Sequence, residues 1–218
     1  MMLKAQGLQK SYGSLKVLKG VDIEVDKGEV VAIVGASGAG KSTLLHILGT
    51  LDTPDAGTVL IDNKNVFAGN GNGLAQFRNR NIGFVFQFHN LLPEFSALEN
   101  VMIPGLIANG TDEKVKAKAE ELLDLLGIRD RQHHKPSELS GGEQQRTAVA
   151  RALINSPALI FADEPSGNLD SKNASDLHQL FFKLRAQLGH TFIIVTHNEE
   201  FAAMADRKVE MKDGLILH

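Results

Sequence analysis

The amino-acid sequence predicts an α/β fold with a mostly parallel sheet, an antiparallel β edge and an inserted helical subdomain. Three continuously apolar runs, at residues 30–34, 158–162 and 192–195, are typical of parallel strands that are covered on both faces. Residues 21–25 instead alternate apolar and charged side chains, which indicates a half-buried strand near a sheet edge. Helical patterns lie between the apolar runs, and strands that alternate with helices favour a parallel sheet.

Two apolar stripes at helical spacing predict helices that pack one face against the core. The first stripe lies between Thr111, a candidate N-cap, and Gly127, a candidate C-terminal stop. It consists of Val115, Ala119, Leu122 and Leu126. The second stripe precedes Gly189 and consists of Leu177, Leu180, Phe181, Leu184 and Leu188.

The helical subdomain is expected at about residues 88–157, because this stretch contains helical patterns but no clear strand. The flanking residues, about 1–87 and 158–218, then form the α/β core of one domain. Residues 68–73 are rich in glycine and predict a flexible loop. Their GxGxG pattern does not indicate a dinucleotide site, since no apolar strand leads directly into it.

The composition limits the classes of function that the chain can have. With 23 basic and 26 acidic side chains the net charge is −3, so no overall basic face favours nucleic-acid binding. The absence of cysteine excludes disulfides and thiolate metal sites. The N-terminus lacks the apolar core of a secretory signal, and no apolar run approaches the ~20 residues of a membrane span. We therefore expect a cytoplasmic chain that does not insert into lipid and reaches a membrane only through a partner.

A glycine-rich loop follows the apolar run at residues 30–34 and leads into an expected helix at residues 42–48. In this strand–loop–helix context a GxxxxGK[ST] motif binds the phosphates of a nucleotide. The glycines turn backbone N–H groups inward, and the start of the helix adds positive potential. Lys41 supplies a cation for the β- and γ-phosphates, and Ser42 supplies a hydroxyl for Mg²⁺. The candidate nucleotide-binding residues of the loop are Gly35, Ala36, Ser37, Gly38, Ala39, Gly40, Lys41, Ser42 and Thr43.

Two adjacent carboxylates, Asp163 and Glu164, follow the apolar run at residues 158–162. Successive side chains of a strand point to opposite faces, so the two carboxylates can serve different positions. Asp163 is the natural partner of Mg²⁺, because this hard cation prefers oxygen ligands. Glu164 is then placed to act as the general base that polarises an attacking water.

Ser140 and Glu143 form a candidate capping box in front of an expected helix at residues 144–154. The N–H groups at the start of such a helix form an anion site, although a capping box alone indicates only a well-capped helix. The longer match is decisive. Residues 139–153, Leu-Ser-Gly-Gly-Glu-Gln-Gln-Arg-Thr-Ala-Val-Ala-Arg-Ala-Leu, resemble the signature motif of the ATP-binding cassettes of ABC transporters and the helix that follows it.

The resemblance to the ABC family covers essentially the whole chain and implies a RecA-like phosphate-loop NTPase core that binds ATP and Mg²⁺ and hydrolyses ATP. In this family the signature contacts the γ-phosphate of the nucleotide that is bound to the opposite subunit. The signature residues here are Ser140, Gly141, Gly142 and Glu143. One phosphate loop and one signature per chain imply a homodimer. The resemblance also implies integral membrane permease subunits as partners, docked near Gln87 and residues 88–101.

Further residues match elements of the ABC family by position. Tyr12 matches the aromatic residue that stacks on adenine, and Gln87 matches the glutamine that senses Mg²⁺ and links to the permease. Asp170 ends a segment, residues 166–170, that resembles the loop crossing the dimer interface. His197 matches the histidine that contacts the γ-phosphate. The implied catalytic residues are Lys41, Gln87, Glu164 and His197, and the implied metal ligands are Ser42, Gln87 and Asp163.

The other histidines carry no site prediction. His46 lies inside the expected helix at residues 42–48 and is expected to pack or to cap rather than to bind a ligand. The remaining ones considered, His89, His133, His134 and His178, show no metal-ligand spacing.

Residues 86–104 (Phe-Gln-Phe-His-Asn-Leu-Leu-Pro-Glu-Phe-Ser-Ala-Leu-Glu-Asn-Val-Met-Ile-Pro) are similar to the ATPase subunits of bacterial lipoprotein-releasing systems. This similarity implies a motor at the cytoplasmic face of the inner membrane, which powers lipoprotein release to a periplasmic carrier. Residues 162–170 fit a broader group that includes macrolide exporters and cell-division cassettes. Ser166 stands where that group more often has threonine, and Asn198 where it more often has an acidic residue.

Three alternatives stay open at this point. A macrolide or peptide exporter, or a cell-division complex, would use the same motor, although the end of the chain at His218 favours a form without a fused membrane domain. A soluble ABC ATPase acting on DNA or ribosomes would carry a long coiled-coil insertion or a second cassette, and neither is present. A phosphate-loop kinase would not need the signature motif.

Overall fold

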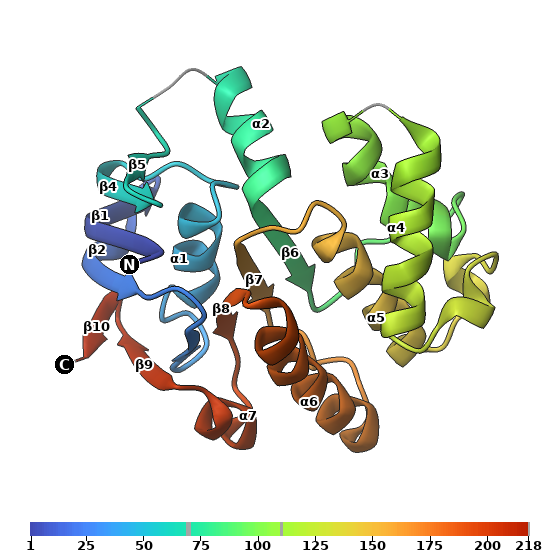
Figure 1. Cartoon of the computed structure of the whole chain (residues 1–218). Coiled ribbons are helices and arrows are strands. Elements are labelled where there is room, and N and C mark those ends of the chain that lie inside the picture. The colour runs from blue at the N-terminus through green and yellow to red at the C-terminus, as the bar shows by residue number, and fades with distance from the viewer. Residues whose placement is uncertain (69–70, 110, 218) are drawn as a thin grey trace.

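The computed structural model describes residues 1–68, 71–109 and 111–217 and contains two sheets with helices around them (Figure 1). The N-terminal sheet is antiparallel, in the order β2-β1-β4-β5. Its strands are β1 (Leu3–Tyr12), β2 (Leu15–Val25), β4 (Ala56–Ile61) and β5 (Lys64–Asn65). The second sheet has the order β10-β9-β3-β8-β7-β6 and is parallel except for β10. Its strands are β3 (Val30–Val34), β6 (Ile82–Phe86), β7 (Leu159–Asp163), β8 (Thr191–Val195), β9 (Arg207–Lys212) and β10 (Leu215–Leu217).

The predicted parallel sheet and the predicted antiparallel edge are both confirmed. The apolar strands β3, β8 and β7 are neighbours in the second sheet and are buried along almost their whole length. Because side chains alternate along a strand, Ile193 packs into a core with the N-terminal sheet and α1 (Lys41–Leu48), whereas Phe192 packs into a second core on the opposite face. At the edge of the N-terminal sheet, residues 21–25 of β2 alternate between buried and exposed, as their pattern predicts.

A group of helices lies on the side of the molecule away from the N-terminal sheet (Figure 1). It consists of α3 (Ala97–Asn109), α4 (Asp112–Leu125), α5 (Gly141–Leu153) and short 3₁₀ turns at Arg129–Arg131 and Pro136–Glu138. Apolar side chains of these helices join those of β6, β7 and β8 in the second core. Among its described residues, the stretch 88–157 contains no strand, in agreement with its sequence pattern. The exact boundaries of a helical subdomain at residues 88 and 157 stay a prediction.

The two predicted apolar stripes lie on α4, with Leu126 at its C-cap, and on α6 (Ser171–Leu188). All four residues of the first stripe are buried, and Gly127 follows α4 with a φ of 70°. Thr111 occupies the N-cap position, but its side chain makes no capping hydrogen bond. On α6 the prediction is wrong for Leu188, which is 48% exposed. This residue ends the helix immediately before the left-handed Gly189, which stops the helix and leads the chain into β8.

The glycine-rich segment at residues 68–73 differs from its prediction. A helix, α2 (Gly71–Asn81), begins inside this segment, so the expectation of a loop is wrong for residues 71–73. Residues 69–70 lie outside the described part of the chain. Farther along the helix, Leu74 and Phe77 pack against the core, and this tertiary contact outweighs the poor helix propensity of glycine.

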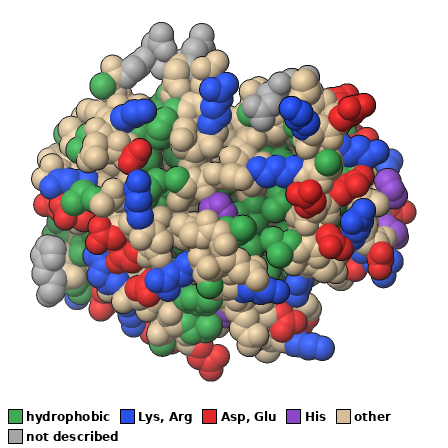
Figure 2. All heavy atoms as spheres, viewed as in Figure 1, with side chains coloured by type: hydrophobic (Ala, Val, Ile, Leu, Met, Phe, Trp, Pro, Cys, Tyr) green, Lys and Arg blue, Asp and Glu red, His purple; other side chains and the backbone are tan. Residues whose placement is uncertain are grey.

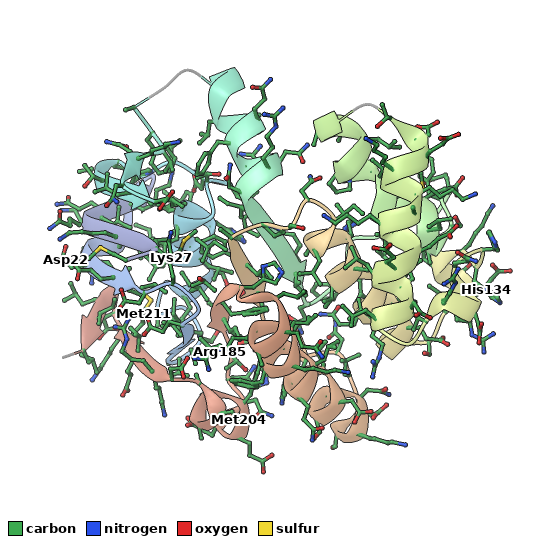
Figure 3. The ribbon with its side chains drawn as sticks, in the orientation of Figure 1. Asp22, Lys27, His134, Arg185, Met204 and Met211 are labelled. Carbon is green, nitrogen blue, oxygen red and sulfur yellow. The ribbon has the colours of Figure 1, made fainter. Side chains whose placement is uncertain are left out.

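Arg185, labelled in Figure 3, ties α6 to the parallel sheet. Its Nε donates a hydrogen bond to the carbonyl of Gly28 at 2.7 Å, and its second nitrogen lies 2.9 Å from the carboxylate of Asp206. Asp206 in turn accepts a hydrogen bond from the N–H of Val30, at the start of β3. Asp206 lies just after α7 (Glu199–Met204). Arg185 therefore connects α6 to the start of β3 and to the chain after α7.

Candidate active site

The phosphate loop joins β3 to α1 at the carboxyl end of a central strand. Gly35, Gly38 and Gly40 have φ angles of 144°, 79° and 99°, at which a side chain would be strained. A Cβ atom at Gly35 would also overlap the carbonyl oxygen of Met211 in β9, so only glycine fits there. The N–H groups in the first turn of α1 have no intrahelical acceptors and are therefore available to an anion.

Lys41, the first residue of α1, folds back over the loop. Its Nζ donates hydrogen bonds to the carbonyls of Gly35 at 2.8 Å and Ala36 at 3.0 Å. Neutral carbonyls bind an ammonium group more weakly than phosphate oxygens do. The lysine can therefore exchange these two contacts for a triphosphate without losing hydrogen bonds.

Ser42 and Asp163 come together although they are far apart in sequence. The hydroxyl of Ser42 donates to Oδ1 of Asp163 at 3.1 Å. Burial raises the pKa of Asp163 above its ordinary value, and the hydrogen bond from Ser42 opposes that shift. His46 packs edge-on against Phe86, as expected of a packing residue, but its Nε2 also lies 3.7 Å from the carboxylate of Asp163.

Glu164 and His197 form the most direct contact between two candidate catalytic residues. Nδ1 of His197 lies 2.7 Å from Oε2 of Glu164, and the N–H of His197 donates to the same oxygen at 3.2 Å. Glu164 has a φ of 46°, a left-handed conformation that is uncommon outside glycine. The N–H of Glu164 donates a hydrogen bond to the carbonyl of Val195 in β8, and the carbonyl of Glu164 accepts a hydrogen bond from the N–H of Gly167. The carboxylate is therefore aimed by a strained turn and not by strand alternation alone.

Gln87 leads from β6 into an irregular segment, and its side chain contacts the loop after Glu164. Its Nε2 donates to Oδ1 of Asn168 at 3.0 Å, and Asn168 donates back to the carbonyl of Gln87 at 3.1 Å. His89 and Asn90 follow with φ angles of 53° and 50°. Their carbonyls both accept hydrogen bonds of 2.6 Å from the guanidinium of Arg151 in α5. This arginine thus connects the segment after Gln87 to the helix that follows the signature.

Tyr12 ends β1 with its ring half exposed. Its hydroxyl donates to Oδ2 of Asp52 at 2.6 Å, and Nζ of Lys10 lies 5.1 Å from the centre of the ring. The hydrogen bond to Asp52 raises the pKa of Tyr12 above its usual value. These contacts fix the tilt of the aromatic ring at the rim of the site.

Most of the predicted site residues described so far line one open cavity of about 680 Å³. Its lining includes Tyr12, Gly35, Ser37, Gly38, Gly40, Lys41, Ser42, Thr43, Gln87, Glu164 and His197. The fold therefore brings together predicted residues from β1, the phosphate loop and the ends of β6, β7 and β8. Asp163 is connected to the cavity by its hydrogen bond with Ser42, which lines it. Ala36 and Ala39 contribute to the shape of the loop, because the N–H of Ala39 donates a hydrogen bond to the carbonyl of Ala36 at 3.2 Å.

The signature lies at the start of α5 and forms the predicted capping box. Ser140 accepts from the N–H of Glu143 at 3.3 Å, and Glu143 accepts from the N–H of Ser140 at 2.8 Å. The hydrogen bonds that the N–H and the hydroxyl of Ser140 donate to the carboxylate, aided by Arg131 at 3.0 Å, lower the pKa of Glu143. Asp170 caps α6 by accepting from the N–H of Asn173 at 2.9 Å. Among the described residues, neither the signature nor Asp170 lines the 680 Å³ cavity of the same chain.

Three contacts were not foreseen from the sequence. Asp52 is the hydrogen-bond partner of Tyr12, and Gln145 donates to the carbonyl of Pro165 at 2.6 Å. His178 is buried against Ser166 and Phe201. Each of the three contacts joins residues that are distant in sequence, so no local pattern marks it.

The fold and this site define an ATPase of the phosphate-loop class. A family model described as ABC transporter matches residues 18–167. The chain belongs to the ABC transporter family and is one of its ATP-binding and ATP-hydrolysing cassettes.

Relatives and solved structures place the chain more closely. The lipoprotein-releasing system ATP-binding protein LolD of Bacteroides thetaiotaomicron is 62% identical over 215 residues, which are 99% of each chain. LolD of Porphyromonas gingivalis is 59% identical over 216 residues, again 99% of each chain. The structure of the dimeric ATP-binding cassette MJ0796 with ADP and Pi has a TM-score of 0.92 and 40% identity, and the match covers 100% of this chain and 97% of that one.

Within the described ranges, no helix has both the length and the apolar character that crossing a membrane requires.

Proposed function

We propose that this chain is the motor subunit of an ABC transporter that releases lipoproteins from the bacterial inner membrane to a periplasmic carrier. The motor part of the proposal is carried by one observation: Lys41, Glu164 and His197 line the same cavity. The cargo is supported by the full-length identity of 52–62% to relatives that are named as lipoprotein-releasing ATPases. The chain would act at the cytoplasmic face of the membrane, bound to permease subunits.

The proposed reaction is attack of water on the γ-phosphate of ATP. Glu164 polarises the water as general base, and His197, 2.7 Å away, holds that carboxylate while it contacts the γ-phosphate. Lys41 releases Gly35 and Ala36 and binds the β- and γ-phosphates. Tyr12 stacks on the adenine at the rim of the cavity.

The oxygens of Ser42 and Asp163 fit Mg²⁺, which prefers oxygen ligands and takes few of them from the protein. The side chain of Gln87 lies at the same cavity and completes the proposed set of ligands. When bound, Mg²⁺ neutralises charge on the β- and γ-phosphates. Its charge would also favour the ionised form of Asp163, against the effect of burial on the pKa.

We further propose that two copies of the chain form each complete site. The N-terminus of α5 is a preformed anion site in a separate part of the chain from its own phosphate loop, so it is available to the nucleotide of a second copy. Ser140, Gly141, Gly142 and Glu143 would contact that γ-phosphate. Asp170 and its loop would lie at the contact between the copies.

A dimer of this kind predicts a result for Glu164→Gln, which should bind ATP but hydrolyse it slowly. With ATP, light scattering is expected to give twice the mass of the chain; without ATP it should give one copy. Adding Ser140→Arg should abolish the dimer, because arginine fills the anion site. Ser96→Arg is the matched control, since Ser96 and Glu99 form a similar capping box at α3. Single copies in every condition would contradict the shared site.

An apolar groove between α2, β6 and α3 supports the place proposed for the permease subunits. Figure 2 shows hydrophobic side chains gathered between the core and the helical group on this face. The groove has a volume of about 520 Å³, and its lining includes Leu51, Phe84, Phe86 and Ile107. Ile107 is 73% exposed and Phe88, next to Gln87, is 74% exposed. An apolar cytoplasmic segment of the permease would cover them.

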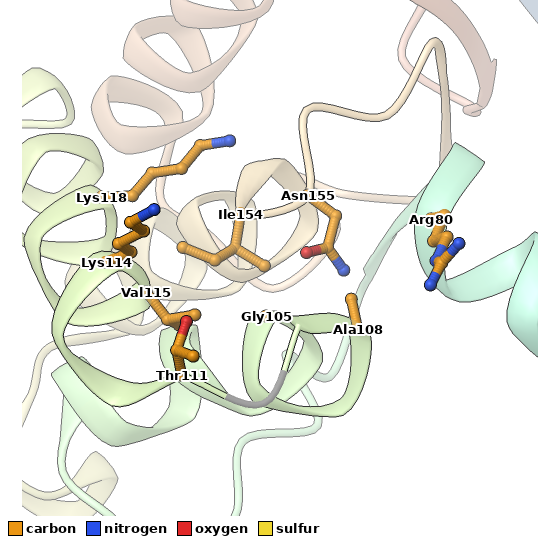
Figure 4. Close-up of a pocket in the computed structure, with 9 residues that line it drawn as sticks. All are labelled: Arg80, Gly105, Ala108, Thr111, Lys114, Val115, Lys118, Ile154 and Asn155. Carbon is orange, nitrogen blue, oxygen red and sulfur yellow. The ribbon is translucent and has the colours of Figure 1, made fainter.

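A second cavity adjoins this groove, because Ile154 and Asn155 line both. Its volume is about 670 Å³, and Figure 4 shows Lys114 and Lys118 from α4 on one side and Arg80 from α2 on the other. Three cationic side chains around one cavity favour a carboxylate over an apolar or basic group. We therefore propose that the permease segment carries an acidic residue beside its apolar face.

The proposed function is tested by reconstitution. The cassette and the membrane proteins that co-purify with it from the source cell are placed in liposomes that contain a lipoprotein. ATP is expected to transfer the lipoprotein to a soluble carrier, and a complex with Glu164→Gln is expected to transfer none. Hydrolysis that exports a macrolide or peptide, with no lipoprotein released, would assign the chain to the exporter alternative.

A further inference from the structure

His178 on α6 is a buried histidine that contacts the segments following Glu164 and His197. Its ring is 5% exposed, and its Nε2 lies 2.9 Å from the hydroxyl of Ser166, within hydrogen-bond distance. The ring of His178 also stacks on the ring of Phe201 in α7: the two rings are 9° from parallel, with centres 3.7 Å apart. One side chain therefore connects a loop that follows β7 to a helix that follows β8.

The Ser166 contact concerns the position of Glu164. Glu164 holds a left-handed φ of 46°, and such a conformation persists only where the surrounding structure fixes it. Side chains from elsewhere in the fold hold the chain after it at three points on its way to α6. Gln145 donates to the carbonyl of Pro165 at 2.6 Å, His178 holds the side chain of Ser166, and Gln87 and Asn168 are hydrogen-bonded to each other. Loss of the His178 contact would loosen the turn at Glu164.

The Phe201 contact concerns the position of His197. Asn198 caps α7 by accepting from the N–H of Phe201 at 2.8 Å, so Phe201 sits in the first turn, four residues after His197. Phe201 is 1% exposed and also lies near the rings of Phe181 and Phe182 of α6. The stacked ring of His178 thus helps to fix the start of α7, and with it the direction in which His197 leaves β8.

We propose that His178 is a positioning residue for ATP hydrolysis, which holds Ser166 and Phe201 so that Glu164 and His197 keep their contact. The inference rests on the proposed roles of those two residues. A histidine suits this place because its flat ring stacks on Phe201 while a ring nitrogen reaches the hydroxyl of Ser166. Burial lowers the pKa of His178 to about 4, so the ring is neutral at pH 7 and brings no buried charge.

The test is a double-mutant cycle on the complex of the cassette with its membrane subunits. His178→Phe keeps an aromatic ring against Phe201 but loses the hydrogen bond, and Ser166→Ala loses only the hydroxyl. Each change is expected to lower kcat by about 3–10-fold, the rate equivalent of one net hydrogen bond, and to leave KM for ATP within about twofold. The double variant should be no slower than the slower single variant. Ser166→Thr, which keeps the hydroxyl, should restore kcat.

His190→Phe is the matched control. His190 is also buried, its Nδ1 lies 2.6 Å from the carbonyl of Pro157, and its ring meets Phe192 edge-on, but it lies at the opposite end of β8 from His197. This variant should keep the wild-type kcat. Additive losses in the cycle, or an unchanged kcat in Ser166→Ala, would overturn the inference. An inactive wild-type complex would instead contradict the proposed function, so the two failures are distinguishable.

Discussion

Replacing Glu164 by glutamine is expected to lower kcat for ATP by about 10²–10⁴-fold, the usual contribution of a positioned general base. The amide keeps the shape of the side chain but cannot take a proton from water. ATP affinity should stay close to that of the wild-type chain, because the phosphate-binding groups of the loop are unchanged. Steady-state hydrolysis and equilibrium binding of a labelled ATP measure the two quantities separately.

The matched control for this variant is Glu200→Gln. Glu200 is an exposed carboxylate in the first turn of α7, close in sequence to His197 but without a place in the cavity lining. The Glu200→Gln variant should hydrolyse ATP at the wild-type rate. If Glu164→Gln kept near-normal turnover, another group would have to serve as the base, and the contact between Glu164 and His197 would be structural only.

Replacing Lys41 by alanine is expected to lower ATP affinity by about 10–10²-fold, as the loss of charged hydrogen bonds implies. Turnover at saturating ATP should fall as well, since the lysine also faces charge on the transferred phosphate. Calorimetric titration with ATP provides the affinity. The fold should be unaffected, because Lys41 contacts only the two loop carbonyls among the hydrogen bonds described.

Lys27→Ala provides the comparison for the loss of one positive charge. Lys27 is an exposed lysine whose Nζ lies 3.4 Å from Asp62 on the surface, and it does not line the 680 Å³ cavity. The ATP affinity of the Lys27→Ala variant should match that of the wild-type chain. An unchanged affinity in Lys41→Ala would mean that backbone N–H groups alone hold the phosphates.

Those parts of the site that depend on local sequence could be predicted. The phosphate loop needs glycines at fixed spacing, and the capping box needs only Ser140 and Glu143, so each is legible within a few residues. The parallel strands were equally legible, because cover on both faces leaves a continuous apolar run. The C-terminal stop at Gly127 was also predicted correctly, because a left-handed glycine ends a helix through local backbone geometry alone.

The parts that depend on long-range contacts could not be predicted. The start of α2 was missed, because Leu74 and Phe77 stabilise it through the core despite its glycines. The alternation rule for strands gave Asp163 and Glu164 different directions, but it could not show the left-handed turn at Glu164. His178 was set aside for want of a metal spacing, since nothing in a linear pattern brings α6 to Ser166.

The contact made by Arg151 bears on how a transporter of this kind would connect its parts. The guanidinium holds the carbonyls of His89 and Asn90, two residues in left-handed conformations, and it belongs to the helix that begins at the signature. A push on the segment after Gln87 must therefore either carry α5 along or break two short hydrogen bonds. In the proposed dimer, force applied from the membrane side would reach the neighbouring copy's ATP along α5, which begins at Gly141.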